Sequence, residues 1–419
     1  MEIEDFVQTI IDEPDNDNHR LVLADFLEER GDPRAEMIRL QFQLKEMDRS
    51  DSKRAKLRTR ELKLLRTHGG FGSIPKGVKI RQWHGGFIDE IELTLARFMS
   101  LGDEIFSSSP VRSVILTANT KRFKKMLNLK FLPKLQRVIF KNNHLPDEEL
   151  AEFLKLPALK NIRELSVRNQ DSGNLIVETI CEMPHFENLD ALEVSGMSVD
   201  DNAALAITNS TTLGPLTSLQ LGQAITEIGT EAIAKCQNLG NLKFLELHGR
   251  FGFVGIEHLH DSTFRETLES TELLFNGWAS QFVSRDAPMS SPDNAFHAVN
   301  PLPRLKSLSI GHELTDQVLM NIAKHYETLE SLDLSNNALT DRGVETLADS
   351  PLLANLKRLV LTQNGVTLRG VDSLVSSEHW SGKTKLYLTG NNIDRQGRAM
   401  LREKYGKTFG NLAQDWAFP

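Results

Sequence analysis

Several residue types able to do catalytic or metal chemistry occur in this chain, but their spacing does not fit a known arrangement. Gly249-x-x-Gly252-x-x-Gly255 follows an expected strand, yet its spacing differs from that of a dinucleotide-binding loop. His258 and His260 lie two residues apart on a stretch with helical spacing, so they should diverge around the helix and lie at the surface. The sequence has no zinc-binding helix, no phosphate-binding loop with lysine and no serine elbow. We therefore expect no catalytic residues, no cofactor and no metal site.

The two cysteines, Cys181 and Cys236, are also poor candidates for chemistry, because neither has an obvious base beside it in sequence. They lie two repeats apart, which we expect to be too far for a disulfide. Both are expected to be buried as small apolar side chains. A reduced, cytosolic protein is the simplest interpretation.

A larger group of polar and aromatic residues could bind a partner. Charged residues recur at the third, fifth and seventh positions of a repeated phrase, and they total five basic against seven acidic residues, a net of −2. The signs are segregated along the chain, which suits a protein partner with complementary patches better than a uniform polyphosphate. Together with nearby histidine and aromatic side chains, the predicted partner-binding residues are Arg137, Lys141, Arg168, Glu193, Phe244, Glu246, His248, His312, Asp333, Arg358, Lys385 and Tyr387.

The elements that must position these residues are repeats. The repeated phrase is leucine-x-x-leucine-x-leucine followed three places on by a polar residue, most clearly from Leu329 to Asn337 and from Leu356 to Asn364. Twelve copies follow one another with a dominant step near 27 residues. Their first residues are Ile88, Val111, Leu135, Ile162, Leu189, Leu216, Leu242, Leu268, Leu305, Leu329, Leu356 and Lys383.

Each phrase predicts a short strand, because its leucines alternate with residues that must point to the other face. The asparagine can satisfy backbone groups of the turn that follows the strand. The second half of a unit has helical spacing: Thr340 is a candidate N-cap, and Val344, Leu347 and Ala348 form one apolar stripe. A strand and a helix in every unit predict a curved solenoid with the parallel sheet on its inner wall.

On these residues the array, roughly 88–406, resembles the ribonuclease-inhibitor-like subtype of leucine-rich repeats. The resemblance implies an α/β solenoid, a leucine-rich-repeat horseshoe with a concave parallel β-sheet and convex helices. It also implies a protein that binds other proteins through the concave sheet. Some proteins with this repeat subtype activate a small GTPase, so a GTPase-activating-protein-like regulator is an alternative, as is an inhibitor or sensor subunit of a larger complex.

Residues 1–70 differ from the array and predict a small all-α module. Gly31 should close one helix, and Asp32 with Pro33 should begin the next. The sequence from Arg20 to Gln41 resembles the bacterial repeat-companion domain, a short helical module at the N-terminus of repeat proteins that has no agreed activity. We expect a connector at 71–87, an irregular insertion at 277–304 and a C-terminal capping tail at 407–419.

Composition supports a folded protein that acts by binding. The charged fraction of 25% and the hydrophobic fraction of 40% are ordinary for a globular chain. A net charge of −8 disfavours nucleic acid as a partner. No signal peptide and no membrane-spanning run are visible, so we expect a cytoplasmic location and no membrane partner. The sequence therefore predicts a non-enzymatic scaffold or adaptor for an unidentified protein, either monomeric or part of a hetero-complex.

Overall fold

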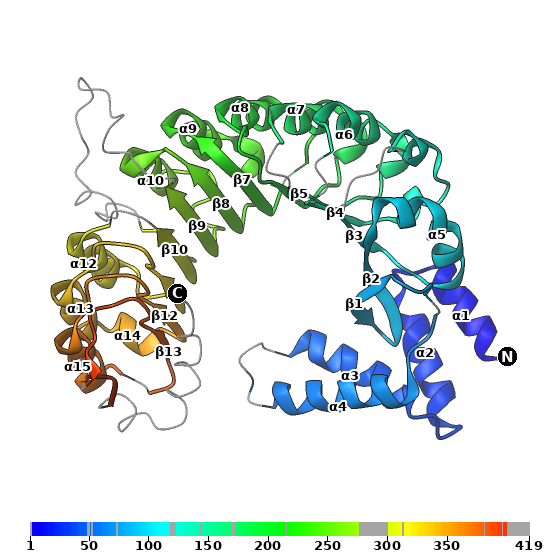
Figure 1. Cartoon of the computed structure of the whole chain (residues 1–419), viewed down its shortest axis with the longest axis horizontal. Coiled ribbons are helices and arrows are strands. Elements are labelled where there is room, and N and C mark those ends of the chain that lie inside the picture. The colour runs from blue at the N-terminus through cyan, green and yellow to red at the C-terminus, as the bar shows by residue number, and fades with distance from the viewer. Residues whose placement is uncertain are drawn as a thin grey trace. The chain divides into compact units, whose positions relative to one another are not determined.

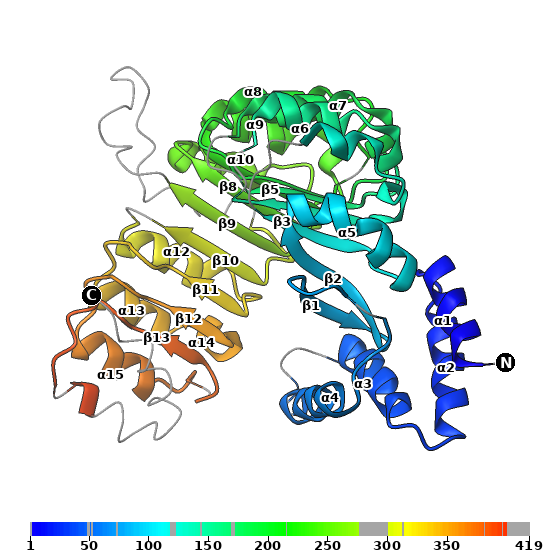
Figure 2. The same cartoon turned by 45° about the vertical axis from the view of Figure 1, so that its right-hand side comes forward.

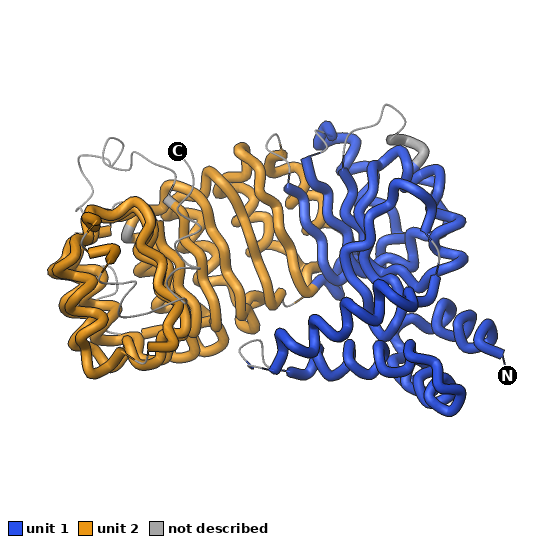
Figure 3. Tube along the Cα trace, turned by 60° about the horizontal axis from the view of Figure 1, so that its bottom comes forward, with its two compact units in different colours: residues 1–170, 183–189 blue, residues 171–182, 190–419 orange. Residues whose placement is uncertain are grey.

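The chain forms two compact units, which Figure 3 shows in different colours. Unit 1 contains residues 1–170 and 183–189, and unit 2 contains residues 171–182 and 190–419. The computed structural model describes residues 2–47, 51, 53–72, 74–117, 123–142, 145–168, 172–214, 216–275, 301–311, 314–380, 382–395 and 397–399.

Unit 1 begins with helices and continues with alternating strands and helices (Figures 1 and 2). Its four leading helices match the all-α start that the sequence predicts. The longer elements are α1 Ile3–Asp12, α2 Asp17–Glu28, α3 Arg34–Glu46, α4 Arg54–His68, β1 Lys79–His84, β2 Phe87–Thr94, α5 Leu95–Ser108, β3 Ser113–Thr117, β4 Arg137–Lys141, α6 Asp147–Leu154 and β5 Glu164–Arg168. Short 3-10 turns, such as Leu132–Lys134 and Pro157–Leu159, lead into the later strands.

Unit 2 repeats one strand and one helix along its length. Its elements are α7 Asn174–Glu182, β6 Ala191–Val194, α8 Asp201–Asn209, β7 Ser218–Ile225, α9 Glu227–Lys235, β8 Phe244–Gly249, α10 Gly252–His260, β9 Ser270–Phe275, β10 Ser307–Gly311, α12 Asp316–His325, β11 Ser331–Asp333, α13 Asp341–Ala348, α14 Leu352–Asn355, β12 Arg358–Val360, α15 Leu368–Ser376 and β13 Lys385–Tyr387. Helices α8, α9 and α10 lie side by side over one face of β7, β8 and β9 (Figure 1).

The strands confirm the predicted repeat. Each of β3 to β13 begins two residues after its predicted marker, so all the markers fall on real units. Within unit 1, β2 to β5 pair in parallel and in chain order, and the same holds for the pairs recorded from β6 to β13 in unit 2. The fold is thus an α/β solenoid of the leucine-rich-repeat type. One strand was not predicted: β1, inside the expected connector, pairs antiparallel with β2.

The helical module packs on the first hairpin of unit 1 through a buried polar junction. Arg20 is 1% exposed, its guanidinium donates to the Pro14 carbonyl at 2.8 Å, and it lies over the ring of Phe87. Burial lowers the pKa of Arg20 to about 10, so the guanidinium stays charged at neutral pH. His84 of β1 lies 2.6 Å from Asp17 of α2. The turn between β1 and β2 needs glycine at position 85, since a Cβ there would lie 2.3 Å from Arg20 Cδ.

Gly31 adopts a left-handed φ of 67° after α2, as predicted. Helix α3 begins one residue later than predicted, with Pro33 as its N-cap and Arg34 as its first residue, and Asp32 Oδ1 accepts the Arg34 backbone N–H at 2.9 Å. On the far side of the hairpin, Asp15 accepts hydrogen bonds from Gln136 at 2.8 Å and from Arg112 at 3.0 Å. The module is therefore tied to the first repeats by charged groups as well as by apolar packing.

Asparagines after the strands of unit 2 bind the turn of the preceding repeat. Asn364 Oδ1 accepts the Leu339 N–H at 3.0 Å, and its Nδ2 donates to the Leu334 carbonyl at 2.8 Å. Asn391 makes the equivalent bonds to Val366 and Leu361. These contacts confirm the predicted role of the asparagine, and they connect neighbouring repeats.

A second connection between neighbouring repeats joins the first residues of their helices. Thr340 and Thr367 cap α13 and α15, as the sequence predicts for Thr340. In addition, Asp341, the first residue of α13, accepts the Thr367 N–H at 2.7 Å, the Thr367 hydroxyl at 2.6 Å and the Gly370 N–H at 3.1 Å. Glycine is required at position 370 because a Cβ would lie 2.6 Å from Asp341 Oδ1. We call this contact the Asp–Thr–Gly link.

The Asp–Thr–Gly link recurs at two further places in unit 2. Asp201 accepts from Thr226 and Gly229, and Asp316 accepts from Thr340. It explains why threonine and glycine recur with fixed spacing at the predicted helix starts. The expected insertion at 277–304 lies outside the described residues except for its last four residues, and the expected tail at 407–419 lies outside them entirely.

Candidate protein-binding face

The side chains of unit 2 that point away from the helices form rows across neighbouring strands, and we call this side of the sheet the outward face. Figures 1 and 2 show the helices on the other side of the strands. Strand pairing places residues with the same position in each repeat next to one another. The first row, here the serine row, is Ala191, Ser218, Phe244, Ser270, Ser307, Ser331, Arg358 and Lys385. The second, here the acidic row, is Glu193, Gln220, Glu246, Glu272, Ser309, Asp333, Val360 and Tyr387.

The three basic candidates of unit 1 do not form one cluster. Arg137 lies at the start of β4, where its guanidinium contacts the carboxylates of Glu90 and Glu164, the latter at 2.7 Å. Lys141 lies at the other end of β4, beside Arg168 in register. Arg168 Nε donates to the Ser166 hydroxyl at 3.1 Å. The structure thus brings Lys141 and Arg168 together and places Arg137 in a separate ion-pair network.

All three acidic candidates fall in the acidic row of unit 2. Glu193 lies on β6 at the start of this row. Glu246 Oε1 accepts the Gln220 amide at 2.5 Å and lies 2.8 Å from His248 Nε2. Asp333 accepts from Ser335, and its other oxygen lies 3.1 Å from the Arg358 guanidinium. These carboxylates are oriented by neighbours, which gives the middle of the outward face a fixed pattern of negative charge.

The twelve predicted binding residues do not include Glu272, although it holds the fifth position of its repeated phrase. It lies directly between Glu246 and Ser309 in the acidic row. Its carboxylate makes no hydrogen bond or ion pair with the described part of the chain. Burial raises the pKa of Glu272, and the neighbouring carboxylates of Glu246 and Asp333 raise it further. The signal available in the sequence was the recurrence of glutamate at the fifth position of adjacent repeats.

The remaining candidates flank this acidic centre. Phe244 lies on β8 two residues before Glu246 on the same face and is half-buried. At the far end of unit 2, Arg358 lies 5.4 Å from the centre of the Tyr387 ring, next to the exposed Lys385. His312 lies outside the described residues.

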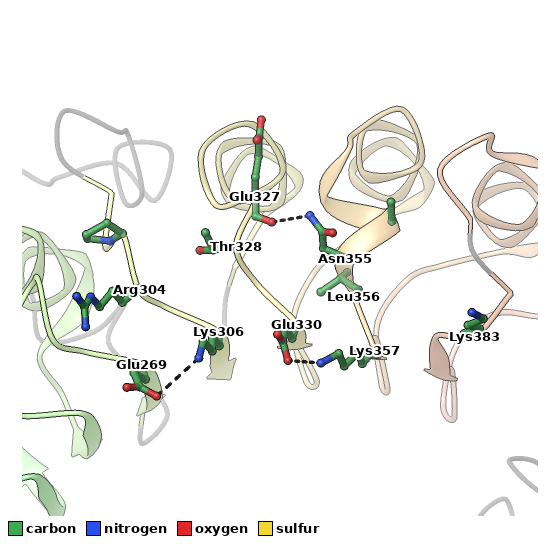
Figure 4. Close-up of a pocket in the computed structure, with 12 residues that line it drawn as sticks. Glu269, Arg304, Lys306, Glu327, Thr328, Glu330, Asn355, Leu356, Lys357 and Lys383 are labelled. Carbon is green, nitrogen blue, oxygen red and sulfur yellow. Dashed lines mark hydrogen bonds and ion pairs between the residues drawn. The ribbon is translucent and has the colours of Figure 1, made fainter. Parts of the chain in front are cut away.

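A groove of about 1020 Å³ runs along the edge of the sheet where β9 to β13 begin (Figure 4). The charged residues that precede these strands alternate in sign and pair between repeats. Lys306 lies 4.0 Å from Glu269, and Lys357 lies 2.7 Å from Glu330. The edge of the sheet is therefore largely self-neutralised, unlike the acidic row a few residues further along the same strands.

The histidine and cysteines considered above for catalysis are buried in the packed interior. His260 is 7% exposed and lies 3.0 Å from the Tyr326 hydroxyl, so the expectation of a surface position was wrong. Burial lowers the pKa of His260 to about 4 and raises that of the Cys181 thiol to about 12. Cys181 and Cys236 are free and buried, as predicted. Within the described ranges, no group of three histidine, cysteine or acidic side chains could hold a metal ion.

Two of the three glycines around residue 250 serve packing, whereas Gly252 has open space around its Cα and adopts a left-handed φ of 55°. A Cβ at Gly249 would lie 2.0 Å from the Ile225 carbonyl oxygen, and one at Gly255 would lie 2.8 Å from the Thr230 hydroxyl. Both glycines therefore allow β8 and α10 to lie close to the preceding repeat. Among the helices that the structure describes, none has the length and apolar character needed to cross a membrane.

Comparisons with known proteins agree with this architecture. A family model described as a leucine-rich repeat matches residues 327–348. The match agrees with the recurring strand–helix unit, and the fold is that of leucine-rich repeats. No curated protein matches the chain.

Two solved structures are similar to parts of the chain. A protein from Bacteroides fragilis is 17% identical, covers 64% of this chain and 78% of its own, and has a TM-score of 0.40. An internalin, InlF, from Listeria monocytogenes is 18% identical, covers 70% of this chain and 69% of its own, and has a TM-score of 0.33.

Proposed function

We propose that this protein is a non-enzymatic scaffold or adaptor that binds a protein partner on the outward face of its sheet. The observation that carries the proposal is the open acidic row in unit 2, with the half-buried carboxylate of Glu272 at its centre. Leucine-rich-repeat folds serve in general as protein-interaction scaffolds. The aromatic side chains of Phe244 and Tyr387 add contact area of the kind that protein interfaces favour.

We extend the proposal to the rest of the chain. The repeats belong to the ribonuclease-inhibitor-like subtype, which is supported by the helices of two or more turns in most units. The helical start is a repeat-companion module that caps the array, which is supported by its polar junction with the first hairpin. A cytoplasmic location is supported by the two free, buried cysteines.

Site-specific photo-crosslinking tests the proposed face. A photoreactive amino acid replaces Ser307 in the outward serine row of one full-length variant, and Ser373 on α15 in a matched control. Both serines lie in unit 2 and are partly exposed, so the larger side chain can extend toward solvent at either position. Crosslinked products formed in cells are identified by mass spectrometry. We expect the same protein to be captured repeatedly from position 307 and not from position 373.

Capture of that protein from position 373 alone would contradict the proposal, because the binding surface would then be the helical side of unit 2. If neither position gives a crosslinked product, the photoreactive group is moved to Lys385 and to Lys141, which lie in the two other groups of predicted binding residues. Failure at all outward positions would reject binding through this face.

A further inference from the structure

Among the residues that the structure describes, carboxylates at the outward-facing strand positions of each unit have partners within the chain, with one exception. In unit 1, Arg137 contacts both Glu90 and Glu164, and Lys79 lies 3.1 Å from Glu92. In unit 2, His248 and Gln220 contact Glu246, and Arg358 contacts Asp333, as described above. Each of these carboxylates therefore has at least one donor from a neighbouring residue of the chain.

Glu272 is the exception among the described residues. Like charges directly opposite one another on neighbouring strands destabilise a sheet, and Glu272 is opposite Glu246. Its other neighbour in the row, Ser309, carries no charge that could compensate. The raised pKa of Glu272 reports the same cost, since burial and the two nearby carboxylates disfavour its ionised form.

The positions beside Glu272 carry mostly small side chains. The adjacent positions Ser270, Ser307 and Ser309 are small, whereas Phe244 forms an apolar side on β8. A lysine or arginine stem can pack on an aromatic ring while its charged end reaches a carboxylate. The sheet edge differs, because Glu269 and Lys306, which directly precede β9 and β10, neutralise each other's charge there.

We infer that the Glu246–Glu272 pair receives a lysine or arginine side chain from a basic segment of the partner. This inference rests on the proposed function and specifies its chemistry. The entering cation supplies a direct ion pair for Glu272, which among the described residues has only the longer-range charges of His248 and Arg358 in its favour, with the ring of Phe244 beside the stem. A basic segment also fits the remaining charge of the row, since Asp333 lies two strands from Glu272 on the same face.

Binding of a simple cationic probe tests the inference. Fluorescein-labelled octalysine is titrated with the full-length protein at low salt and followed by anisotropy, with octaglutamate as the negative probe. We expect Glu272→Gln to weaken octalysine binding by about tenfold, the usual loss when one charge-assisted contact is removed. The matched control is Glu257→Gln on α10, which removes the same charge from a half-buried position on the helical side.

Equal effects of Glu272→Gln and Glu257→Gln would overturn the inference, because binding would then follow net charge alone. Circular dichroism of each variant confirms that the fold is intact. The photo-crosslinking assay separates this failure from failure of the proposed function. If Glu272→Gln leaves capture through position 307 unchanged, the face binds a partner but not through this carboxylate.

Discussion

The Asp–Thr–Gly link predicts a large effect from a half-exposed aspartate on the helical side of unit 2. We predict that Asp341→Ala destabilises unit 2, because three donors of the following repeat lose their acceptor together: the Thr367 N–H, the Thr367 hydroxyl and the Gly370 N–H. Water can reach part of this site, so it will replace some of the lost bonding.

The magnitude follows from these three contacts. A hydrogen bond to a charged group contributes about 1.5–3 kcal/mol when it is buried, and about 1 kcal/mol is reasonable for each bond at this half-exposed site. The loss of all three gives about 3 kcal/mol for Asp341→Ala. Asp341→Asn keeps one carbonyl oxygen as acceptor for the two N–H groups, so it should cost about 1 kcal/mol.

Urea denaturation followed by far-ultraviolet circular dichroism measures these differences. The control is Asp372→Ala, which removes an exposed aspartate of α15 whose carboxylate lies 3.5 Å from the Ser376 hydroxyl, a long contact. We expect the order of stability to be control, then Asp341→Asn, then Asp341→Ala. If Asp341→Ala and the control differ by less than about 0.5 kcal/mol, the link does not hold the repeats together.

Three further predictions concern other parts of the molecule. Lowering the pH from about 6.5 to 4 should reduce the free energy of unfolding of unit 2 by about 3 kcal/mol through His260. The reason is that burial lowers its pKa to about 4, so the unfolded chain binds the proton at a higher pH than the folded one. The variant His260→Gln should therefore flatten the pH profile of urea midpoints. At neutral pH, Glu272→Gln should stabilise the unliganded protein by about 0.5 kcal/mol, and this gain should vanish in acid, because a carboxyl with a raised pKa destabilises the fold only when ionised; a loss of stability at pH 7 would argue against the unmatched charge. Gly85→Ala should destabilise unit 1 by about 1–3 kcal/mol, since the new Cβ would lie 2.3 Å from Arg20 Cδ at a φ of 53°, and faster hydrogen exchange in the β1–β2 hairpin should report it.

The repeat was predictable because its signal is local and recurs twelve times. Leucines with period two and an asparagine at a fixed distance specify each strand and the turn after it, so the strand starts agree with the markers. The antiparallel strand β1 was missed because its exposed residues lack that alternation, and its pairing depends on the turn at Gly85 and Gly86.

Contacts between repeats were harder to predict than the repeats themselves. The pairing of Arg137 with Glu90 joins residues 47 positions apart, and only the register of β2, β3 and β4 brings them together. Likewise, His260 has ordinary polar neighbours in sequence, but it faces Tyr326 of another repeat and is buried there. A linear pattern shows which face a residue occupies, whereas the charge state of its surroundings depends on neighbouring strands.

The Asp–Thr–Gly link has a consequence for how such a chain can change in length. A unit that begins its helix with threonine, aspartate and, two residues later, glycine carries both the acceptor for its successor and the donors for its predecessor, as residues 340–343 do. A duplicated copy of that segment and its strand would meet matching groups at both junctions. Whole units can thus be added or removed in steps of 27 residues, while residues of the outward face, which take no part in the link, are free to diverge.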